Sequence, residues 1–421
     1  MRSLAKEARA ARHAAVLDEA TAEFNREGVS GASLSKIARR VGITRAGLYN
    51  YCLDRQDLVH QCYLRTCKSF KSDLLRAEQT PGSSLDRVAA FVRIVLDPDH
   101  SPVAALTELG FLDPEQEASV RAARGETVAA MRALLAQGVK EGSIRSCDLD
   151  IVSQALFGML TWTTLSRVWT ADTDDTLGTR IAAMAPQIIL EGVATDGVDI
   201  PPSRARLAGI LPAAPNSERD EWLEALARAG SHLFNRRGID GVSLDDVAAE
   251  LGVTKGAVYH YFDSKPAFVA HCYDRAFDII SRIIDAAGSG ATGLECMMTV
   301  VELSVQAQLE DIHVLWPSSG FGGLPAPLQK KLLERSNFLV GRSAELTRRG
   351  FVDGTIKPWD VAPMKHLTSG AHALLAQWLP LEGKHSTKEV GREISRFLCL
   401  GLTARTKPRP RQRNAALAAA R

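Results

Sequence analysis

The sequence repeats itself at an offset of 210 residues, and this repeat constrains the architecture more than any other feature. Residues 24–28 (FNREG) recur as residues 234–238 (FNRRG), and the match runs without a gap over residues 24–63, where 15 of 40 positions are identical. It resumes downstream, where Gly110-Phe111 matches Gly320-Phe321. Solenoid repeats are only about 20 to 50 residues long, so each copy is expected to be a domain-sized unit. The chain is therefore predicted to fold as an intramolecular pseudo-dimer.

The two copies are separated and followed by segments of unusual composition. Between them, residues 199–217 contain four prolines and little hydrophobic periodicity, which is typical of a linker. After Thr403 the chain is rich in arginine and holds no acidic residue, which is typical of a disordered basic tail.

Hydrophobic residues within each copy recur at helical spacing, and no alternating strand pattern with hairpin signals is present. The first helix is expected to end at Gly28, and the equivalent helix of the second copy at Gly238. Ser33 and Ser243 are suitable N-caps for a second, short helix. The predicted fold class is all-α.

A third helix follows the short one. Gly42 separates the two helices, the third opens on Thr44-Arg45, and the second copy repeats this arrangement. Two short helices joined by a glycine turn are the layout of a helix-turn-helix, whose second helix enters the major groove of DNA. Leu48 and Tyr51 are three residues apart and are expected to face inward. The positions left to face DNA are Thr44, Arg45, Ala46, Gly47, Tyr49 and Asn50 in the first copy, and Thr254, Lys255, Gly256, Ala257, Tyr259 and His260 in the second.

Residues 33–51 and residues 243–262 resemble the TetR/AcrR family of transcriptional regulators. The resemblance implies an N-terminal three-helix domain that binds operator DNA and a helical C-terminal domain that binds a small effector and dimerises. It also implies phosphate contacts at Tyr49, Tyr259, Arg55 and Lys265. The capping residues Ser33 and Ser243 are predicted to belong to the DNA-binding surface as well. The predicted segments are DNA-binding domain 1 (1–60), effector and dimerisation domain 1 (61–198), the linker (199–217), DNA-binding domain 2 (218–270), effector and dimerisation domain 2 (271–403) and the tail (404–421).

Charge distinguishes the two DNA-binding domains. The whole chain has a formal charge of only +2, so any nucleic-acid face must be local. Residues 1–55 hold ten Lys and Arg and six Asp and Glu, whereas residues 218–265 hold six and nine. Because phosphate contacts supply the salt-dependent part of DNA affinity, the first domain is expected to bind DNA more tightly. The basic residues outside its recognition helix either join this face or are ordinary solvated side chains: Arg2, Lys6, Arg9, Arg12, Arg39 and Arg40.

The two recognition helices also differ in their small residues. Ala46-Gly47 in the first copy becomes Gly256-Ala257 in the second, so the two helices are expected to prefer different half-sites.

Four aromatic residues of the C-terminal domains are candidates for an apolar effector pocket, because ligands of helical domains usually bind between helices. They are Phe157, Trp162, Phe321 and Trp378. The alternative is that they belong to the core or to the four-helix dimerisation seam expected near residues 155–169 and 367–379.

Two other functions are alternatives. Residues 288–293 (GSGATG) match the GxGxxG pattern of dinucleotide-binding loops, which raises the alternative of an enzyme. That fingerprint follows a strand in a βαβ unit, whereas these glycines follow a helical run, so an interhelical loop is favoured. The other alternative is an interaction module in which only the first helix-turn-helix binds DNA.

No catalytic residue, metal site or cofactor is predicted. The seven cysteines form no CxxC and no ligand spacing, and they are expected to be reduced in a cytosol. No apolar stretch is long enough to span a membrane, so a cytoplasmic location is expected.

These features together predict a sequence-specific transcriptional regulator that is not an enzyme. We expect a repressor that docks two unlike recognition helices in successive major grooves of one operator, about 34 to 36 Å apart. A small, apolar effector is expected to release the DNA by favouring another conformation. A further homodimer, with two chains and four recognition helices on the DNA, is the alternative assembly.

Overall fold

The computed structural model describes residues 2–170, 174–200, 206–211, 217–316, 319–379 and 384–404. All regular elements within these residues are helices, which confirms the predicted all-α class. The first repeat comprises α1 (Arg2–Gly31), α2 (Leu34–Arg40), α3 (Arg45–Leu48), α4 (Arg55–Glu78), α5 (Ser84–Val95), η1 (Leu109–Phe111), α6 (Pro114–Glu141), α7 (Leu149–Thr170) and α8 (Leu177–Glu191). The second comprises α9 (Glu218–Arg237), α10 (Leu244–Glu250), α11 (Lys255–Tyr259), α12 (Lys265–Ala287), α13 (Gly293–Leu309), η3 (Ser319–Gly323), α14 (Ala326–Val352), α15 (Val361–Ala373), α16 (Leu375–Trp378) and α17 (Thr387–Leu400).

The helix ends of the two DNA-binding domains follow the sequence signals. Gly28 (φ 72°) interrupts α1 and Gly238 (φ 87°) ends α9, both in the left-handed region that glycine adopts at low cost. Ser33 caps α2 by accepting a backbone hydrogen bond from its first turn, and Ser243 forms a capping box with Asp246 at the start of α10. Both predicted N-caps are confirmed.

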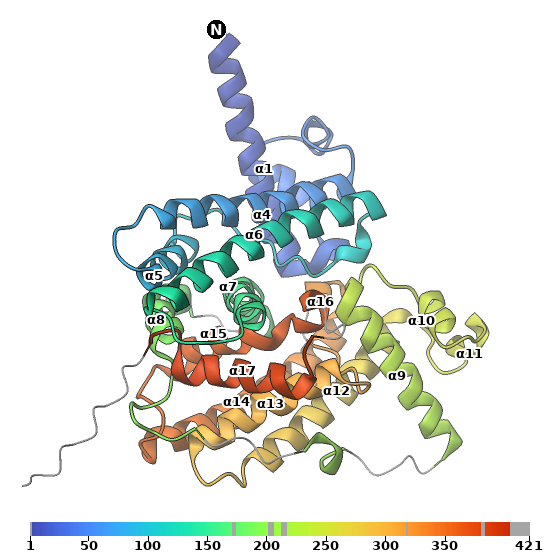
Figure 1. Cartoon of the computed structure of the whole chain (residues 1–421). Coiled ribbons are helices and arrows are strands. Elements are labelled where there is room, and N and C mark those ends of the chain that lie inside the picture. Colours follow the sequence, from blue (N-terminus) through green and yellow to red (C-terminus); the bar gives the residue numbers. More distant parts are fainter. Residues whose placement is uncertain are drawn as a thin grey trace, which may run out of the picture.

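The two repeats meet along α7 and α15, in the middle of the molecule shown in Figure 1. These helices cross at two glycines, because a Cβ on Gly158 would lie 2.4 Å from the carbonyl oxygen of Gly370. Conversely, a Cβ on Gly370 would lie 2.6 Å from the Cα of Met159. Only glycine permits so close an approach, and it lets residues of both repeats join one hydrophobic core. The segments expected to form the seam are therefore the ones that pack together.

The ends of α8 and α17 add backbone hydrogen bonds between the repeats. The N–H of Val193 donates to the carbonyl of Leu398 at 2.9 Å, and the N–H of Leu402 donates to the carbonyl of Ile189 at 3.0 Å. Two isolated antiparallel bridges follow. After α8, Ala194 pairs with Ile356 in the turn between α14 and α15, and after α17, Thr403 pairs with Ile144 in the turn between α6 and α7. The contact between the repeats is thus partly backbone to backbone.

Some predicted boundaries fall inside continuous structure. α4 and α12 each run unbroken from the small N-terminal bundle into the larger domain, so the boundaries drawn at residues 60 and 270 lie within helices. In the linker, the short turn η2 (Leu207–Gly209) inserts the buried side chain of Leu207 into the second-repeat core. The rest of the linker at residues 201–205 and 212–216, and the tail from residue 405, lie outside the described residues. None of the helices in the described ranges is both long and apolar enough to cross a membrane.

Candidate nucleic-acid interface and internal cavities

The two recognition helices, α3 and α11, present the same pattern of exposed and buried side chains. Leu48 and Val258 are fully buried and seat each helix on its domain. The residues expected to face DNA lie on the open side: Thr44, Arg45, Ala46, Tyr49, Asn50, Thr254, Lys255, Gly256, Tyr259 and His260 are exposed, and Gly47 and Ala257 are half-buried. Both helices are therefore placed so that a DNA groove can reach them.

Hydroxyl groups at the helix N-termini are mostly used within the protein. Ser33 and Ser243 are exposed but cap α2 and α10, and Thr44 Oγ1 accepts a hydrogen bond from the Gly47 N–H at 2.9 Å. Thr254 makes no such cap hydrogen bond at the start of α11. A phosphate approaching the second helix would therefore find this hydroxyl available.

Basic residues of α2 in the first domain are neutralised by the preceding helix. Lys36 Nζ lies 3.2 Å from Glu23 Oε1, and Arg40 Nη1 lies 3.3 Å from Glu19 Oε2. Glu23 is almost fully buried, so it holds these cations against the domain. The positive charge counted in the sequence is thus larger than the charge this surface offers to DNA.

The recognition helices themselves differ in charge pairing. Lys255 Nζ on α11 lies 3.0 Å from Asp245 Oδ2 on α10. Arg45, at the same position on α3, has no carboxylate partner among the residues that the structure describes. Arg45 can therefore pair with a phosphate without breaking an ion pair, whereas Lys255 would have to leave Asp245.

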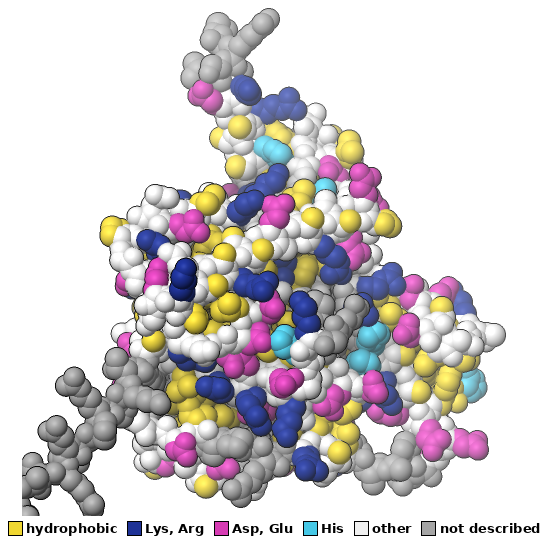
Figure 2. Space-filling view, in the orientation of Figure 1, with side chains coloured by type: hydrophobic (Ala, Val, Ile, Leu, Met, Phe, Trp, Pro, Cys, Tyr) yellow, Lys and Arg dark blue, Asp and Glu magenta, His cyan; other side chains and the backbone are white. Residues whose placement is uncertain are grey.

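The long first helix adds basic side chains beside α3. α1 has 30 residues against 20 in α9, and its N-terminal turns project from the molecule (Figure 1). Lys and Arg side chains gather along this projection (Figure 2). Arg12 Nη1 donates to the carbonyl of Val41 at 2.9 Å, and Arg9 Nη2 donates to that of Asn50 at 3.4 Å. The projection is thereby held next to both helices of the first helix-turn-helix.

The residues expected at the start of the fourth helix, Arg55 and Lys265, have contacts within the protein. Arg55 Nη1 donates to three carbonyl oxygens of residues 29–32, at the C-terminal end of α1, at 2.5 to 3.1 Å. Burial lowers the pKa of Lys265, and the nearby carboxylates Asp240 and Glu108 act in the opposite direction. Both side chains are half-buried near Asp240, at the contact between the two DNA-binding domains, and their phosphate contacts stay predictions.

That contact consists of a short chain of hydrogen bonds. The N–H of Ser30, in the first domain, donates to Asp240 Oδ2 in the second at 2.7 Å. The N–H of Asp240 in turn donates to Glu108 Oε2 at 2.8 Å, and Glu108 is fully buried. The two DNA-binding domains are thus tied to each other and to the first repeat's larger domain.

The turns that carry the repeated Gly-Phe motif reach across to the opposite DNA-binding domain. η1 of the first repeat packs on the end of α9, where a Cβ on Gly110 would lie 2.8 Å from the Cβ of Arg237. η3 of the second repeat packs on the end of α1, where a Cβ on Gly322 would lie 2.4 Å from the Cα of Glu27. Each larger domain therefore contacts the DNA-binding domain of the other repeat.

A cavity of about 160 Å³ lies among α12, α13, α14 and α15 of the second repeat, with α7 of the first repeat on one side. Its walls are mainly aromatic and aliphatic, and include Trp162, Trp169 and Phe277. The titratable side chains that line it are Lys365, His366 and His372. We call it the open cavity.

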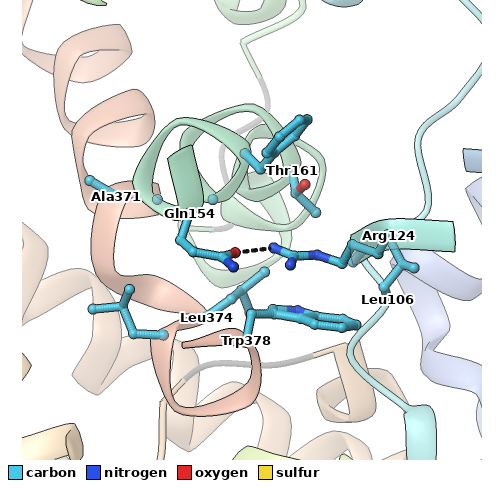
Figure 3. Close-up of a pocket in the computed structure, with 12 residues that line it drawn as sticks. Leu106, Arg124, Gln154, Thr161, Ala371, Leu374 and Trp378 are labelled. Atoms are coloured by element: carbon cyan, nitrogen blue, oxygen red, sulfur yellow. Dashed lines mark hydrogen bonds between the residues drawn. The ribbon is translucent and has the colours of Figure 1, made fainter. Parts of the chain in front are cut away.

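The equivalent place in the first repeat is filled, and its cavity measures about 10 Å³. Figure 3 shows the side chains that fill it: the Arg124 guanidinium lies over the Trp378 ring, 4.0 Å from its centroid, and donates to Gln154 Oε1 at 2.7 Å. In this part of the chain the repeat offset is 212 residues, as the match of residues 141–145 (EGSIR) to residues 353–357 (DGTIK) shows. At that offset, Arg124 and Trp378 correspond to Ser336 and Ser166, which line the open cavity. Two large side chains close one cavity, and two serines leave the other open.

Comparisons with known proteins support the presence of two helix-turn-helix regions in this chain. The family model described as "Bacterial regulatory proteins, tetR family" matches residues 16–62 and 226–272, which contain both helix-turn-helix regions. The chain belongs to the TetR family. A second model, "Tetracyclin repressor-like, C-terminal domain", matches residues 85–165. TetR-family proteins are DNA-binding transcriptional regulators and not enzymes, and the double match is consistent with a tandem duplication.

Two curated relatives illustrate the extent of the similarity. The Transposon Tn10 TetC protein of Escherichia coli is 24% identical over 153 residues, which are 35% of this chain and 74% of the relative. The biofilm operon regulator IcaR of Staphylococcus aureus, a negative transcriptional regulator by its name, is 36% identical over 52 residues, or 12% of this chain and 28% of the relative.

Among solved structures, the ketosteroid transcriptional regulator KstR2 of Mycobacterium tuberculosis gives a TM-score of 0.38 at 20% identity, covering 45% of this chain and 96% of that one. PfmR of Thermus thermophilus gives 0.36 at 20% identity, covering 41% and 96%.

The four aromatic residues expected in the effector pocket of this TetR-family chain are distributed over three places. Trp162 lines the open cavity, whereas Phe157 and Trp378 line the filled one. Phe321 lies in η3 and packs on Trp169, with ring centroids 4.4 Å apart. Sequence reasoning missed Lys365 and the serines of the open cavity, although a position-by-position comparison of the two repeats contains the signal that marks them.

The glycine-rich segment at residues 288–293 is the turn between α12 and α13, as the helical context predicts. Arg349 fills it from α14, donating to the carbonyls of Gly288 at 3.1 Å and Gly290 at 2.8 Å. The N–H groups that a phosphate would need are also occupied, since Gly290 donates to the Ala287 carbonyl, Ala291 to Glu295 Oε2 and Gly293 to Asp353 Oδ2. The turn therefore does not form a phosphate cradle.

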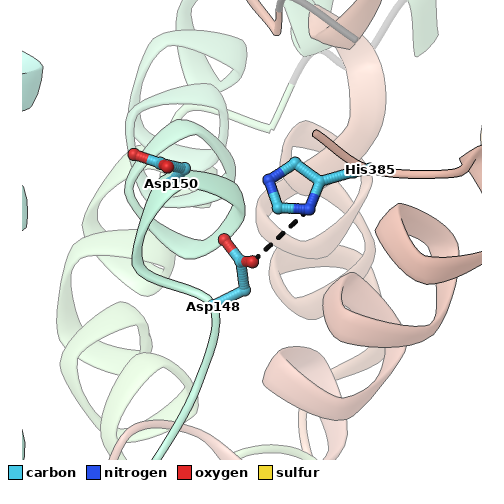
Figure 4. A group of neighbouring side chains, drawn as sticks. All are labelled: Asp148, Asp150 and His385. Carbon is cyan, nitrogen blue, oxygen red and sulfur yellow. Dashed lines mark ion pairs between the residues drawn. The ribbon is translucent and has the colours of Figure 1, made fainter. Parts of the chain in front are cut away.

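One polar cluster lies between the repeats near the start of α7. Asp148, Asp150 and His385 bring ligand-type atoms within 4.8 Å of one another (Figure 4). Asp148 Oδ1 accepts a hydrogen bond from the Ile151 N–H at 3.0 Å, and its Oδ2 lies 3.6 Å from His385 Nδ1. Helix capping and this ion pair explain the cluster, and we assign no metal to it. The seven cysteines are free thiols.

Proposed function

We propose that one chain of this TetR-family regulator binds one operator through both recognition helices, and that a small molecule in the open cavity releases it. The observation that carries the proposal is the seam of α7, α8, α15 and α17, because each repeat already has its dimerisation partner within the same chain. The hydrogen bond from Ser30 to Asp240 supports a fixed spacing between the two DNA-binding domains.

Two contacts link the open cavity to the second DNA-binding domain. α12 carries the cavity residues Phe277 and Ile280, and the same unbroken helix begins at Lys265 in the second DNA-binding domain. The backbone N–H of the cavity residue Trp316 donates to Asn235 Oδ1 on α9 at 3.0 Å. A ligand that moves α12 or Trp316 would therefore reorient the domain that carries α11.

A third contact links the same cavity to the first DNA-binding domain. Trp169 lines the cavity and packs on Phe321 of η3, and η3 packs on the end of α1 at Glu27. One bound molecule would thus act on both DNA-binding domains. Since a ligand shifts an equilibrium only by its differential affinity, release requires that it bind the DNA-free conformation more tightly.

We propose repression as the regulatory mode, supported by the likeness of the helix-turn-helix to that of IcaR, which is named as a negative regulator. A protein that binds operator DNA works where the chromosome lies, so we place it in the bacterial cytoplasm.

The stoichiometry tests the proposal. Sedimentation velocity of the full chain with a duplex that contains its operator, first located by genome-wide footprinting, is expected to give one chain per duplex. A complex of two chains per operator would refute the one-chain assembly and favour the four-helix alternative.

A second candidate function follows from the pairing of Lys255 with Asp245. In it, only the first helix-turn-helix reads DNA and the second serves for pairing. Base-specific protection under α3 alone, with none one helical turn away, would favour this interaction module. Protection of two unlike half-sites would exclude it.

A further inference from the structure

The open cavity contains a cation without a counter-ion. Lys365 extends from α15, and its Nζ donates to Ser343 Oγ at 2.5 Å. It takes part in no ion pair with any described carboxylate, and no Asp or Glu is among the residues that line the cavity. Burial lowers the pKa of Lys365 to about 8, so the side chain is still mainly an ammonium at neutral pH. A half-buried charge in this position lacks the partner that buried charges normally have.

Two further groups in the same cavity lack hydrogen-bond partners. Trp316 Nε1 and His372 Nδ1 are buried and make no hydrogen bond. The indole N–H is only a donor, and burial lowers the pKa of His372 to about 3, so its ring is neutral and carries one N–H. The two rings contact each other edge to face, with centroids 4.9 Å apart. The ammonium and the indole N–H are therefore two donors in this part of the cavity, and His372 adds a third in the tautomer that carries its proton on Nδ1.

The Lys365 ammonium has no counterpart at the equivalent position of the first repeat. Lys365 corresponds to Ser153 in the first repeat, and His372 corresponds to Leu160. The first-repeat cavity is instead filled by the protein's own cation, Arg124, stacked on Trp378. The two cavities therefore hold the same kind of group, but only the second leaves space beside it.

The size of the open cavity limits what can occupy that space. Its volume of about 160 Å³ is close to the roughly 150 Å³ of an engineered apolar cavity that binds benzene. The occupant therefore has a body of about one ring or a short chain, surrounded by Trp162, Trp169 and Phe277.

We propose that the open cavity binds a monocarboxylate with a single-ring or short-chain apolar body, and that its carboxylate pairs with the Lys365 ammonium. This inference rests on the proposed function for its role as an effector, because the ligand would act through the contacts from the cavity to both DNA-binding domains. The carboxylate would supply the missing counter-ion, and charge-assisted hydrogen bonds are the stronger kind.

Calorimetric titration of the full chain without DNA tests the ligand class. The probes are phenylacetate and hexanoate, each compared with its neutral amide, phenylacetamide or hexanamide. We expect one molecule per chain and at least about tenfold tighter binding of each acid than of its amide. Tryptophan fluorescence is expected to change on binding, because Trp162, Trp169 and Trp316 line the site.

Variants locate the carboxylate. Lys365→Met is expected to remove the preference for acid over amide, and Lys365→Gln provides the same test with a polar side chain. Lys330→Met, the same change at an exposed lysine of α14, is expected to keep the preference. Absence of acid binding up to millimolar concentration, equal affinities for acid and amide, or a preference that survives both Lys365 variants would overturn the inference.

A separate operator-release assay distinguishes this inference from the proposed function. Acid binding without release of operator DNA would remove the effector role and leave the ligand class standing. Release by the neutral amides alone would do the reverse.

Discussion

Lys365 and Ser153 occupy equivalent positions of the two repeats, and this difference gives the open cavity an ammonium that the filled cavity lacks. An unpaired buried ammonium raises the free energy of the folded protein, so it persists only where it has a use or a partner. The ligand proposed above provides that partner. At the same scale, two serines in place of Arg124 and Trp378 decide whether there is space for it.

The titration of Lys365 gives a pH dependence that can be checked. Its pKa of about 8 means that the ammonium prevails below pH 8 and is lost above it. The affinity for phenylacetate is therefore expected to be constant between about pH 6.5 and 7.5 and to fall roughly tenfold per pH unit well above pH 8. Two other titratable side chains, His366 and His372, line the cavity. His372 stays neutral in this range because its pKa is about 3. A calorimetric profile that is flat up to pH 9.5 would contradict the assignment.

Arg45 and Lys255 allow a matched comparison of the two DNA faces. Arg45→Ala is expected to weaken operator binding and to reduce the slope of log affinity against log salt by about one, since it removes a free phosphate contact. Lys255→Ala is expected to have a smaller effect, because Asp245 already holds that cation. Fluorescence anisotropy over a range of salt concentrations measures both. Equal slopes for the two variants would show that the Lys255–Asp245 ion pair does not weaken the contact of Lys255 with DNA.

At the scale of elements, α13 and α17 pack closely around a buried acid. Glu302 is 3% exposed, and a Cβ on Gly391 of α17 would lie 3.2 Å from its Cα. Burial raises the pKa of Glu302 to about 7, with Arg392 and Lys388 acting in the opposite direction. The folded state therefore favours the protonated carboxyl and opposes the charged one.

This gives a second pH prediction, for stability. Because the folded-state pKa lies above the ordinary value of 4.5, the free energy of unfolding is expected to fall as pH rises from about 4.5 to 7 and to level off above 7. Glu302→Gln is expected to raise stability at pH 8 by up to about 3 kcal/mol and to remove this decline. Urea unfolding at several pH values measures it, with Glu334→Gln at an exposed position of α14 as the control. A variant less stable than the parent at pH 8 would mean that the charged form is the one the fold requires.

Sequence patterns predicted the elements that depend on local chemistry. Gly28 and Ser33 mark helix ends because conformational freedom and capping act within a few residues, and Leu48 is buried as its spacing indicates. The patterns missed contacts between distant residues. Arg55, whose phosphate contact stays a prediction, also donates to carbonyls 23 to 26 residues earlier in the chain, and no local pattern indicates these bonds. Arg124 meets Trp378 only because α6 and α16 come together at the seam, which no local signal encodes.

At the scale of the whole molecule, the two repeats differ in their cavities, and close contacts at glycines hold them together. Gly158 and Gly370 fix the crossing of α7 and α15, and η1 and η3 tie each larger domain to the opposite DNA-binding domain. Under the proposed function, a change in one cavity would therefore be transmitted within one covalent unit.

The filled cavity offers a test of this view. Arg124→Ser and Trp378→Ser introduce the residues that line the open cavity, and Ser153→Lys adds the missing ammonium. The triple variant is expected to bind two molecules of phenylacetate per chain where the parent binds one, as measured by calorimetry. The double variant without the lysine serves as the control, and it is expected to keep one acid site. A folded triple variant that still binds one molecule would show that the two cavities are not equivalent in shape.

The filled first cavity also bears on how such a regulator responds to rising ligand concentration. A symmetric dimer with two ligand sites can respond steeply, because one bound ligand favours the binding of the next. Of the two equivalent cavities that the described residues form, one is filled, so the open cavity has no equivalent site in the same chain to assist it. Its derepression is expected to follow a simple saturation curve, so that gene output is graded over a wide range of ligand rather than switched at a threshold.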